Sequence, residues 1–496
     1  MARRFVLLAL CAITLFPACD SGGGGDGGDP TARLPLAAGV KITGISLYQG
    51  VGVPIMKDGE VADPNLAPIV SGKDALVRVF LETDDTYTPR DLLARVALTD
   101  ADGTVSFTAQ KAIAAGASVV TTLSTTLNVD VPGEDIKDGQ TINVSVREID
   151  KSAKQDGDTS GAAWPTDGDQ ALQIEEPKPR MKLVLVPVEY NADGSGRLPD
   201  TSDAALQGYE ALFEVMYPIT GIDITVDDPL PYGGTVAAAG TGWSQLLNAV
   251  TQRRTDNGAA KDEFYFGLVA PAASFGAYCN MGCVAGLSWS VTSVPGMSAQ
   301  QAGTGIGFGG GELTYSTYTA AHEVGHLFGR LHAPCGGPDG VDQNYPYSGG
   351  SIGVQGYDST IAQLKGPAQY TDVMGYCQNV WISDYTYSGL FTRSEQIAAL
   401  SGAKVTPPAD GNTTWLSVVQ NSDGTVERGP SLESDVPIDG EPRTVELLDD
   451  SGAVVQTVHG SFVAYSDLGG GMIAFRRPSF DVAAVHVDGL EIVPFR

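Results

Sequence analysis

Three of the five histidines in this chain fall within eleven residues, in the segment HEVGHLFGRLH that starts at His322 and ends at His332. Because an α-helix turns once about every 3.6 residues, side chains four positions apart share a face, so His322 and His326 can bind the same ion. Gly329 is predicted to end the helix, since glycine adopts a left-handed backbone conformation with little strain. The turn that follows returns His332 toward the other two. The segment therefore predicts a metal site built from one helix and one turn.

The carboxylate of Glu323 is one position away from the first histidine, so it is predicted to reach beside the metal rather than onto it. That place suits a general base acting on water at the metal. Three imidazole ligands leave a fourth coordination position open, as catalytic zinc sites require, whereas structural zinc sites are closed. An amphipathic helix can contain HExxH by chance, but the added glycine and third histidine favour a zinc site. We expect Ser316 or Thr317 to cap the helix.

A second segment, YTDVMGYC at residues 370–377, places Met374 in a turn-prone setting 42 residues after His332. Together, the two segments resemble the metzincin superfamily of zinc endopeptidases, whose pattern is HExxHxxGxxH followed by a methionine-containing turn. The resemblance covers residues 322–377 and extends, less specifically, over about 180–400. It implies a Zn²⁺ cofactor bound by His322, His326 and His332.

The same resemblance implies roles for three further residues. Glu323 would be the general base, and Met374 would form a hydrophobic floor beneath the zinc. Tyr376 occupies the position of a tyrosine that, in astacin-like and serralysin-like members, helps to stabilise the tetrahedral intermediate. Other metzincin branches lack that tyrosine role. Without the resemblance, Met374 is an ordinary core methionine and Tyr376 a packed aromatic side chain, so both interpretations stay open at this point.

The composition favours a β-rich globular protein. A chain of 496 residues is too long to fold around one ordinary hydrophobic core, which suggests roughly two to four domains. Glycine is abundant, at 62 residues, and helix formers such as lysine are scarce. The net charge of −29 is spread along the chain without a basic patch, which argues against nucleic-acid binding. The stretch 100–103 begins like a calcium loop, but Lys111 stands where the closing glutamate belongs, which favours a hairpin turn.

Four cysteines lie beyond the N-terminal segment, namely Cys279, Cys283, Cys335 and Cys377. An even number in an exported chain suggests disulfides, and four cysteines allow three pairings. Under the metzincin resemblance, His332 and Met374 both lie close to the zinc, and each is followed three residues later by a cysteine. We therefore expect a Cys335–Cys377 bridge, with Cys279–Cys283 closing a small loop. A cysteine zinc cluster is the alternative, but no two CxxC pairs are present.

The N-terminus is predicted to be a targeting segment. Arg3 and Arg4 precede an apolar run at 5–16 that is too short to span a bilayer comfortably. The run ends in FPAC and a glycine-rich tract, which resembles a bacterial lipoprotein signal and implies cleavage before Cys19 and lipid attachment to its sulfur. Phe16 departs from that pattern, where leucine is usual, so plain secretion is the alternative. We expect an exported cell-envelope lipoprotein, held to a membrane through Cys19, or else a secreted protein.

The predicted fold class is multidomain α+β. A metzincin-like zinc protease domain at 181–402 is expected between β-sandwich-like domains at 35–150 and 403–496. The upstream domain shows strand-like runs at 41–48, 75–81 and 141–148 with poor helical periodicity. The other segments are a signal peptide at 1–18, a Gly-rich tether at 19–34 and a linker at 151–180.

The central domain is expected to mix helices with strands. Residues 283–289 are expected to form the sheet-edge strand with which the substrate backbone pairs. A closing helix is predicted at 381–400. One helical face is predicted from the spacing of Trp243, Leu246, Leu247 and Val250. The remaining predicted elements are a helix at 202–216 and strands at 182–188, 222–226 and 264–269.

These features predict a zinc-dependent endopeptidase that hydrolyses extracellular or envelope proteins or glycoproteins through metal-activated water. The large flanking domains are similar in layout to those of secreted bacterial metzincins that attack glycoproteins. The alternative is a non-catalytic envelope lipoprotein that binds protein or carbohydrate through its β domains. Zinc-dependent hydrolysis of a non-peptide bond is a third interpretation. The intact ligand set and Glu323 favour the first, because an inactive relative would usually have lost one of them.

The cysteine distribution also limits how such an enzyme is held inactive. No cysteine lies between Cys19 and Cys279. An upstream thiolate therefore cannot silence the zinc, as happens with some metzincin propeptides. If the enzyme is latent, an acidic side chain or steric cover must provide the block. The alternative interpretation is that the upstream domain does not block the site and is a permanent recognition module.

Overall fold

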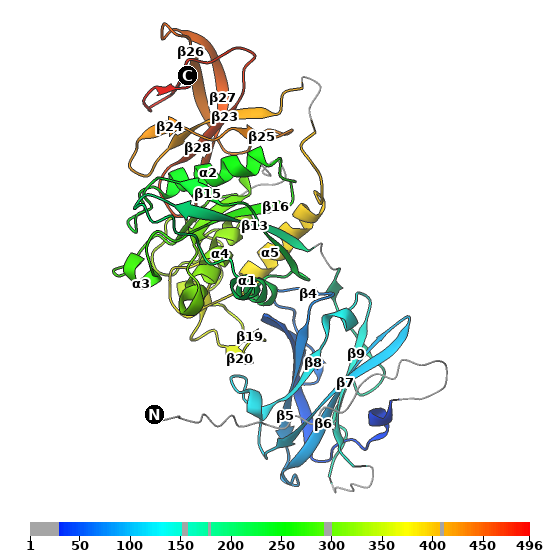
Figure 1. Cartoon of the computed structure of the whole chain (residues 1–496). Helices are drawn as coiled ribbons and strands as arrows, with labels where there is room; N and C mark the ends of the chain where they lie inside the picture. Colours follow the sequence, from blue (N-terminus) through cyan, green and yellow to red (C-terminus); the bar gives the residue numbers. More distant parts are fainter. Residues whose placement is uncertain (1–28, 151–156, 177–179, 292–299, 407–410) are drawn as a thin grey trace, which may run out of the picture.

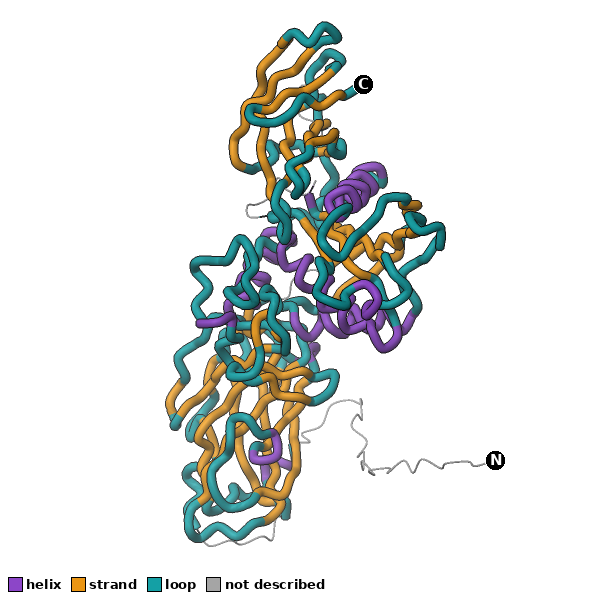
Figure 2. The backbone as a smooth tube through the Cα atoms, turned by 90° about the vertical axis from the view of Figure 1, so that its left-hand side faces the viewer, coloured by secondary structure: helices purple, strands orange, loops and turns teal. Residues whose placement is uncertain are grey.

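The computed structural model of the chain describes residues 29–150, 157–176, 180–291, 300–406 and 411–496. The predicted signal peptide, the lipidation site Cys19 and most of the tether lie outside these residues. The described chain forms three regions in a row, with N-terminal and C-terminal β regions at opposite ends (Figure 1). Helices gather in the middle region, whereas strands dominate both ends (Figure 2). The predicted multidomain chain with many strands and few helices is therefore confirmed.

The N-terminal region contains two antiparallel sheets. One has seven strands in the order β20-β19-β2-β1-β5-β8, with β3 paired to β2. The other has five strands in the order β10-β9-β6-β7, with β11 paired to β9. The bounds are β1 Val40–Gln49, β2 Val51–Lys57, β3 Glu60–Val61, β5 Ala75–Thr83, β6 Arg90–Asp100, β7 Gly103–Ile113, β8 Leu127–Val131, β9 Thr141–Glu148, β10 Ala163–Trp164, β11 Gln170–Ala171, β19 Gly356–Asp358 and β20 Gln363–Lys365.

Side chains alternate across these strands, which places one face of each sheet in the core. In β6, the alternating residues Leu92, Ala94, Val96 and Leu98 are all buried. The predicted hairpin turn at 100–103 is confirmed, because Asp100 pairs with Gly103 where β6 meets β7. Part of the predicted linker at 151–180 is built into this region, since β10 and β11 pair with β9, and β12 (Ile174–Glu175) pairs with β4 (Ile69–Val70).

The end of the predicted tether also belongs to the folded region. Pro30–Arg33 form a short 3-10 helix, η1, capped by Asp29. The Asp29 carboxylate makes an ion pair of 2.6 Å with Arg95 of β6. Further short 3-10 helices in the described part of the chain are η2 Leu123–Thr125, η3 Gly133–Asp135, η5 Gly310–Glu312 and η6 Ser348–Gly350.

The central region has a sheet in the order β14-β13-β16-β18-β17, with β15 paired to β13. All pairings are parallel except that of β17, the edge strand, which runs antiparallel to β18. In Figure 1, α2 lies on the side of the C-terminal region, and α1 and α4 lie on the other side. The bounds are β13 Met181–Tyr190, α1 Asp203–Met216, β14 Ile222–Val226, β15 Leu230–Tyr232, α2 Trp243–Asp256, β16 Glu263–Val269, α3 Phe275–Tyr278, β17 Gly286–Ser288, β18 Ala302–Ile306, α4 Leu313–Leu327, β21 Thr371–Asp372, β22 Val380–Trp381 and α5 Asp384–Ala398.

The predicted elements of the central region are found in the structure, with shifts at their ends. The strands expected at 182–188, 222–226 and 264–269 are β13, β14 and β16. Helix α5 starts later than the predicted residue 381, because Trp381 belongs to β22 and the Ser383 hydroxyl caps the helix by accepting from the Thr386 amide. Among the described residues, no helix combines the length and the apolar composition needed to cross a membrane.

The C-terminal region differs in form from its prediction. It is one eight-stranded sheet, in the order β24-β23-β28-β27-β26-β29-β30 with β25 paired to β23, rather than a two-sheet sandwich. Some of its buried side chains, including Val445, Ile473 and Phe475, form a small cluster of their own, and others, such as Trp415 and Met472, belong to the cluster of the central region. The bounds are β23 Thr414–Gln420, β24 Val426–Arg428, β25 Leu432–Glu433, β26 Glu441–Leu448, β27 Val454–Ala464, β28 Gly471–Arg476, β29 Ala484–Val487 and β30 Val493–Pro494.

Candidate metal centre

Helix α4 carries the first two histidines. It begins at Leu313, so the prediction that Ser316 or Thr317 caps it was wrong. The Ser316 hydroxyl instead donates to the Phe308 carbonyl at 2.9 Å and accepts from the Phe308 amide at 2.8 Å, which ties the preceding loop to the helix. The helix ends at Leu327, and Gly329 has a φ of 78°, as predicted.

The three predicted histidines meet in the structure. The Nε2 atoms of His322 and His326 are 3.1 Å apart. The His332 ring lies 5.4 Å from the His322 ring and 4.6 Å from the His326 ring, measured between centroids. His326 and His332 are buried, with 2% and 1% of their surface exposed. The turn at Gly329 therefore returns the third imidazole to the helix face that carries the other two.

Each histidine is fixed by a backbone carbonyl. The Nδ1 atoms of His322 and His326 donate to the carbonyls of Val373 and Arg330, both at 2.7 Å. The Nδ1 atom of His332 donates to the Asp339 carbonyl at 2.5 Å. A carbonyl can only accept, so these bonds place the proton of each neutral imidazole on Nδ1. When all three rings are neutral, as they must be to bind a metal ion, their Nε2 lone pairs face one another.

A fourth donor comes from the far end of the chain. The Oδ1 atom of Asp467 lies 3.0 Å from Nε2 of His332 and 3.4 Å from Nε2 of His322. Its Oδ2 atom lies 3.8 Å from Nε2 of His326. One donor atom from each of these four residues can be chosen so that all lie within 4.8 Å of one another, and the group could hold a metal ion. No motif in the sequence marks Asp467, which is 135 residues beyond His332.

The donor set fits a divalent cation. Around a tetrahedral zinc ion with bonds of about 2.0–2.1 Å, neighbouring donors lie about 3.3 Å apart. The distances from Asp467 and the 3.1 Å between the two helical imidazoles are close to that spacing. Lone pairs that converge without a hydrogen between them repel unless a cation lies among them. Imidazole and carboxylate donors suit zinc and its neighbours among the first-row metals.

Burial and the contacts with Asp467 determine the pKa values in the cluster. Burial lowers the pKa of His326 to about 3, so its imidazole is neutral at pH 7. Burial alone would also lower the pKa of His322, but its contact with Asp467 raises it to about 9. Burial opposes ionisation of Asp467, yet the hydrogen bonds from His322 and His332 hold the pKa of that carboxyl well below its ordinary value. The carboxylate is therefore ionised among the histidines.

Glu323 lies beside the cluster rather than in it. Its Oε2 atom accepts from the Ser288 hydroxyl of β17 at 2.8 Å and from the Ser466 hydroxyl at 3.2 Å. Burial, and then the negative charge of Asp467, raise the pKa of Glu323 well above its ordinary value. This position agrees with the offset from the first histidine that the sequence predicted.

The methionine turn lies under the helix. Met374 is 1% exposed, and its sulfur lies against Gly325, in the turn of α4 between the two histidines. The Met374 carbonyl accepts from the Ala333 amide at 2.9 Å, so the turn is joined to the segment just after His332. The Tyr376 hydroxyl donates to Oδ1 of Asp467, and its ring centroid lies 5.0 Å from that of His332.

Both predicted disulfides, Cys335–Cys377 and Cys279–Cys283, are present. The first links the segment after His332 to the segment after Met374, and a backbone bond of 2.8 Å from the Tyr376 amide to the Cys335 carbonyl runs beside it. The second closes a loop at the entrance to the site. Disulfides persist in oxidising compartments, so the pair agrees with an extracellular location.

A cavity of about 830 Å³ opens beside the histidine cluster. His322, Glu323, Tyr376 and Asp467 lie on its wall. Its apolar lining includes Phe275, Ile306, Tyr315, Tyr318, Val373 and Val380. The candidate metal site is therefore next to a space large enough for an amino-acid side chain.

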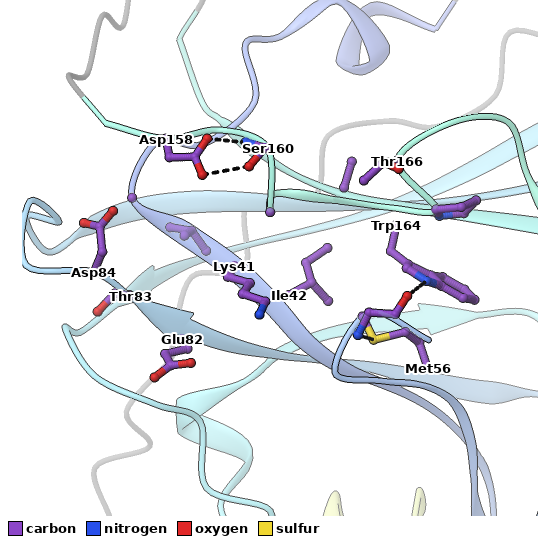
Figure 3. Close-up of a pocket in the computed structure, with 16 residues that line it drawn as sticks. Lys41, Ile42, Met56, Glu82, Thr83, Asp84, Asp158, Ser160, Trp164 and Thr166 are labelled. Carbon is purple, nitrogen blue, oxygen red and sulfur yellow. Dashed lines mark hydrogen bonds between the residues drawn. The ribbon is translucent and has the colours of Figure 1, made fainter. Parts of the chain in front are cut away.

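Another cavity, of about 680 Å³, lies in the N-terminal region (Figure 3). The carboxylate of Asp158 accepts hydrogen bonds from the Ser160 hydroxyl at 2.7 Å and from the Ser160 amide at 2.9 Å. The indole of Trp164 donates to the Gly59 carbonyl. Asp84 accepts from the amide and hydroxyl of Thr86. Two of its acidic groups, Asp84 and Asp158, thus have partners within their own turns, and the histidine cluster is the stronger candidate site.

The chain was also compared with known proteins. No protein-family model matches it, and no curated protein does. Among solved structures, a β-glucuronidase from Parabacteroides merdae matches with 10% identity over 92% of this chain and 76% of that one, at a TM-score of 0.16. A score this low carries no information about fold or function.

Proposed function

We propose that this chain is a metzincin-type zinc endopeptidase that hydrolyses extracellular or envelope proteins or glycoproteins. One observation carries the proposal. Three buried imidazoles, each with its Nδ1 proton bound by a carbonyl, turn their Nε2 atoms toward one point beside Glu323. Hydrogen bonding alone does not explain that arrangement, because the one proton that the raised pKa of His322 would place on its Nε2 can serve only one of the contacts among the three rings and Asp467. A catalytic metal site does explain it.

Zinc is the metal that the donor set fits best. His322, His326 and His332 would hold it. When bound, zinc polarises a carbonyl and lowers the pKa of water to about 7. The carbonyl bonds to each Nδ1 keep the rings oriented and raise their basicity, as the outer partners of zinc histidines do elsewhere.

The chain's own residues have separate roles in the proposed reaction. Glu323, oriented by the Ser288 hydroxyl, accepts a proton from the attacking water and then delivers it to the leaving amine. The Tyr376 hydroxyl donates to the substrate carbonyl oxygen as that oxygen gains negative charge. Met374 packs beneath the turn of α4 and keeps the two helical histidines in place. Proton transfer and charge stabilisation are thereby divided between two side chains.

The surroundings favour a peptide substrate over a small molecule. Strand β17 is at the edge of its sheet, close to Glu323, and an edge strand offers backbone groups that pair with an extended peptide. The apolar cavity next to it accommodates a large hydrophobic side chain of such a peptide. Export, with or without a lipid on Cys19, would place the enzyme among envelope proteins.

The function is tested by comparing wild-type protein with Glu323→Ala and Glu323→Gln, all loaded with zinc. We expect cleavage of casein or of a quenched fluorescent peptide, lost on chelation and restored by zinc. Both variants should retain zinc and lose at least about a thousandfold in kcat/KM, because the base is gone while the ligands remain. Cleavage that persists in metal-free protein, or in Glu323→Ala, would contradict the proposal.

A further inference from the structure

A segment of the C-terminal region lies along the outer edge of β17. The Ser466 amide donates to the Ser288 carbonyl at 2.9 Å, and the Ser290 amide donates to the Ala464 carbonyl at 3.0 Å. Between these bonds, Trp289 and Tyr465 form an antiparallel bridge. Residues 464–466 therefore continue the central sheet beyond its own edge strand, as an added peptide strand would.

Side chains hold this segment in place. The Tyr465 ring stacks on the Trp289 ring at 5.0 Å, with an angle of 26° between their planes, and both residues are buried. The Ser466 hydroxyl accepts from the Ser288 amide at 2.9 Å. Leu468 follows and packs against the central region near Gly240. The contact is therefore formed by backbone, aromatic and apolar groups together.

The same segment contacts every group that the proposed reaction uses. Asp467 lies against all three histidines, and Tyr376 donates to its carboxylate. Its neighbour Ser466 donates to Glu323 at 3.2 Å. With Asp467 present, a metal would have four protein donors, which is the closed arrangement of structural sites, whereas catalytic zinc needs an open position.

We propose that residues 464–468, which we term the inhibitory segment, are a built-in inhibitor of the enzyme. They occupy the edge of β17 where a substrate backbone would pair, and they place Asp467 as a fourth ligand on the metal. The inhibitory segment and a substrate exclude each other, so the active enzyme forms only when the segment leaves. The proposal rests on the endopeptidase function and adds how that function is controlled.

The segment is separate in sequence from the rest of the site. It connects β27 to β28 in the C-terminal sheet, whose buried side chains are divided between a cluster of their own and the cluster of the central region. The segment belongs to neither α4 nor the methionine turn, so its departure would break contacts with them without unwinding either element. Because no upstream cysteine is available, the sequence predicted that an acidic side chain or steric cover would keep a latent enzyme inactive. In this proposal Asp467, which lies downstream of the histidines, is that acidic side chain.

The test uses full-length protein with Asp467→Ala and with Asp467→Asn, which keeps the size of the side chain. The control is Asp488→Ala, because Asp488 is an exposed aspartate of the same sheet, in the turn after β29. We expect both Asp467 variants to raise kcat/KM for a quenched peptide at least tenfold, and the control to leave it unchanged. A peptide hydroxamate, which needs the fourth position, should bind both variants at least tenfold more tightly than wild type.

Metal binding gives a readout that is independent of activity. Loss of one ligand should weaken zinc binding, measured by competition with a chromophoric chelator, by at least about tenfold. The cobalt-substituted variants should differ from wild type in their visible absorption, since the ligand set has changed. The control should match wild type in both measurements.

The outcomes separate the two proposals. If wild type cleaves peptides in a zinc-dependent way and both Asp467 variants are equal or slower, the inhibitory role is wrong and the endopeptidase function stands. Unchanged zinc affinity in both variants would also overturn the inhibitory role, because Asp467 would then not be a ligand. If zinc-loaded wild type and both variants cleave no peptide, the endopeptidase function itself fails.

Discussion

The two β regions flank the same central region, yet they contact it in different ways. The N-terminal region shares a sheet with it, because β2 pairs with β19 through Val51 and Gly356. The C-terminal region contacts it through side chains, including the Lys261–Asp435 ion pair of 2.7 Å and a hydrogen bond of 2.7 Å between Ser244 and Asn421. It also places one connecting segment on a sheet edge and against the histidine cluster. The first contact builds the fold, and the second covers the site.

Further bonds at the N-terminal contact support this distinction. The Trp381 indole donates to the Gly50 carbonyl at 2.9 Å. The buried ammonium of Lys73 donates to the carbonyls of Glu214 and Tyr217 at the end of α1. The buried side chains of the N-terminal and central regions belong to one continuous cluster, which also takes in C-terminal residues such as Trp415 and Met472. The shared sheet and these bonds build the N-terminal region into the fold of the central one.

Among the variants that test how the two β regions contact the central one, Gly50→Ala should have the largest effect. A β-carbon at Gly50 would lie 2.1 Å from the Val215 carbonyl of α1, and Gly50 has a φ of 86°. We expect the free energy of unfolding to fall by about 3 kcal/mol or more, from the clash and the backbone strain together. Thermal unfolding measures the effect.

The matched control for that variant is Gly59→Ala. Gly59 has a φ of 94°, but a β-carbon there would meet nothing within 4 Å. Its cost should be about 1 kcal/mol, from backbone strain alone. Equal destabilisation by the two variants would show that the contact between Gly50 and α1 does not hold the regions together. The N-terminal contact would then not be part of the stable fold.

A smaller effect is expected from Tyr465→Ala. This change removes the ring that stacks on Trp289 and leaves Asp467 in place. An aromatic pair contributes about 0.5–1.5 kcal/mol beyond its buried area, so the inhibitory segment should leave more often and kcat/KM should rise about two- to tenfold. Tyr465→Phe keeps the ring and should match wild type. A fall in peptide cleavage by Tyr465→Ala would mean that the segment supports the site instead of blocking it.

Local sequence was sufficient to predict that three histidines meet at one point and that a turn lies between them. His322 and His326 are four residues apart on one helix, and a glycine after the helix allows the chain to turn back. These local features, within eleven residues, are enough to place His332 beside the other two. The disulfides followed because two cysteines stand three residues beyond groups expected at the metal. The start of α4 was wrong because Ser316 bonds to Phe308, a tertiary contact that a local capping rule does not include.

Contacts between distant segments could not be predicted in the same way. Asp467 is one of many acidic residues in a chain with a net charge of −29, and nothing in its neighbours distinguishes it. The pairing of Val51 with Gly356 joins strands from two regions that the sequence presented as separate. Such contacts depend on how whole sheets are arranged, and hydrophobic periodicity within one strand carries no information about its partner.

The central claim is that the three histidines bind one zinc ion, and X-ray absorption at the zinc edge tests it most directly. Zinc-loaded full-length protein should hold one zinc per chain, with nitrogen and oxygen neighbours at about 2.0–2.1 Å and the scattering of three imidazoles. His326→Ala should lose most of that zinc. A wild-type protein that takes up no zinc, or that binds it through sulfur at about 2.3 Å, would contradict the account.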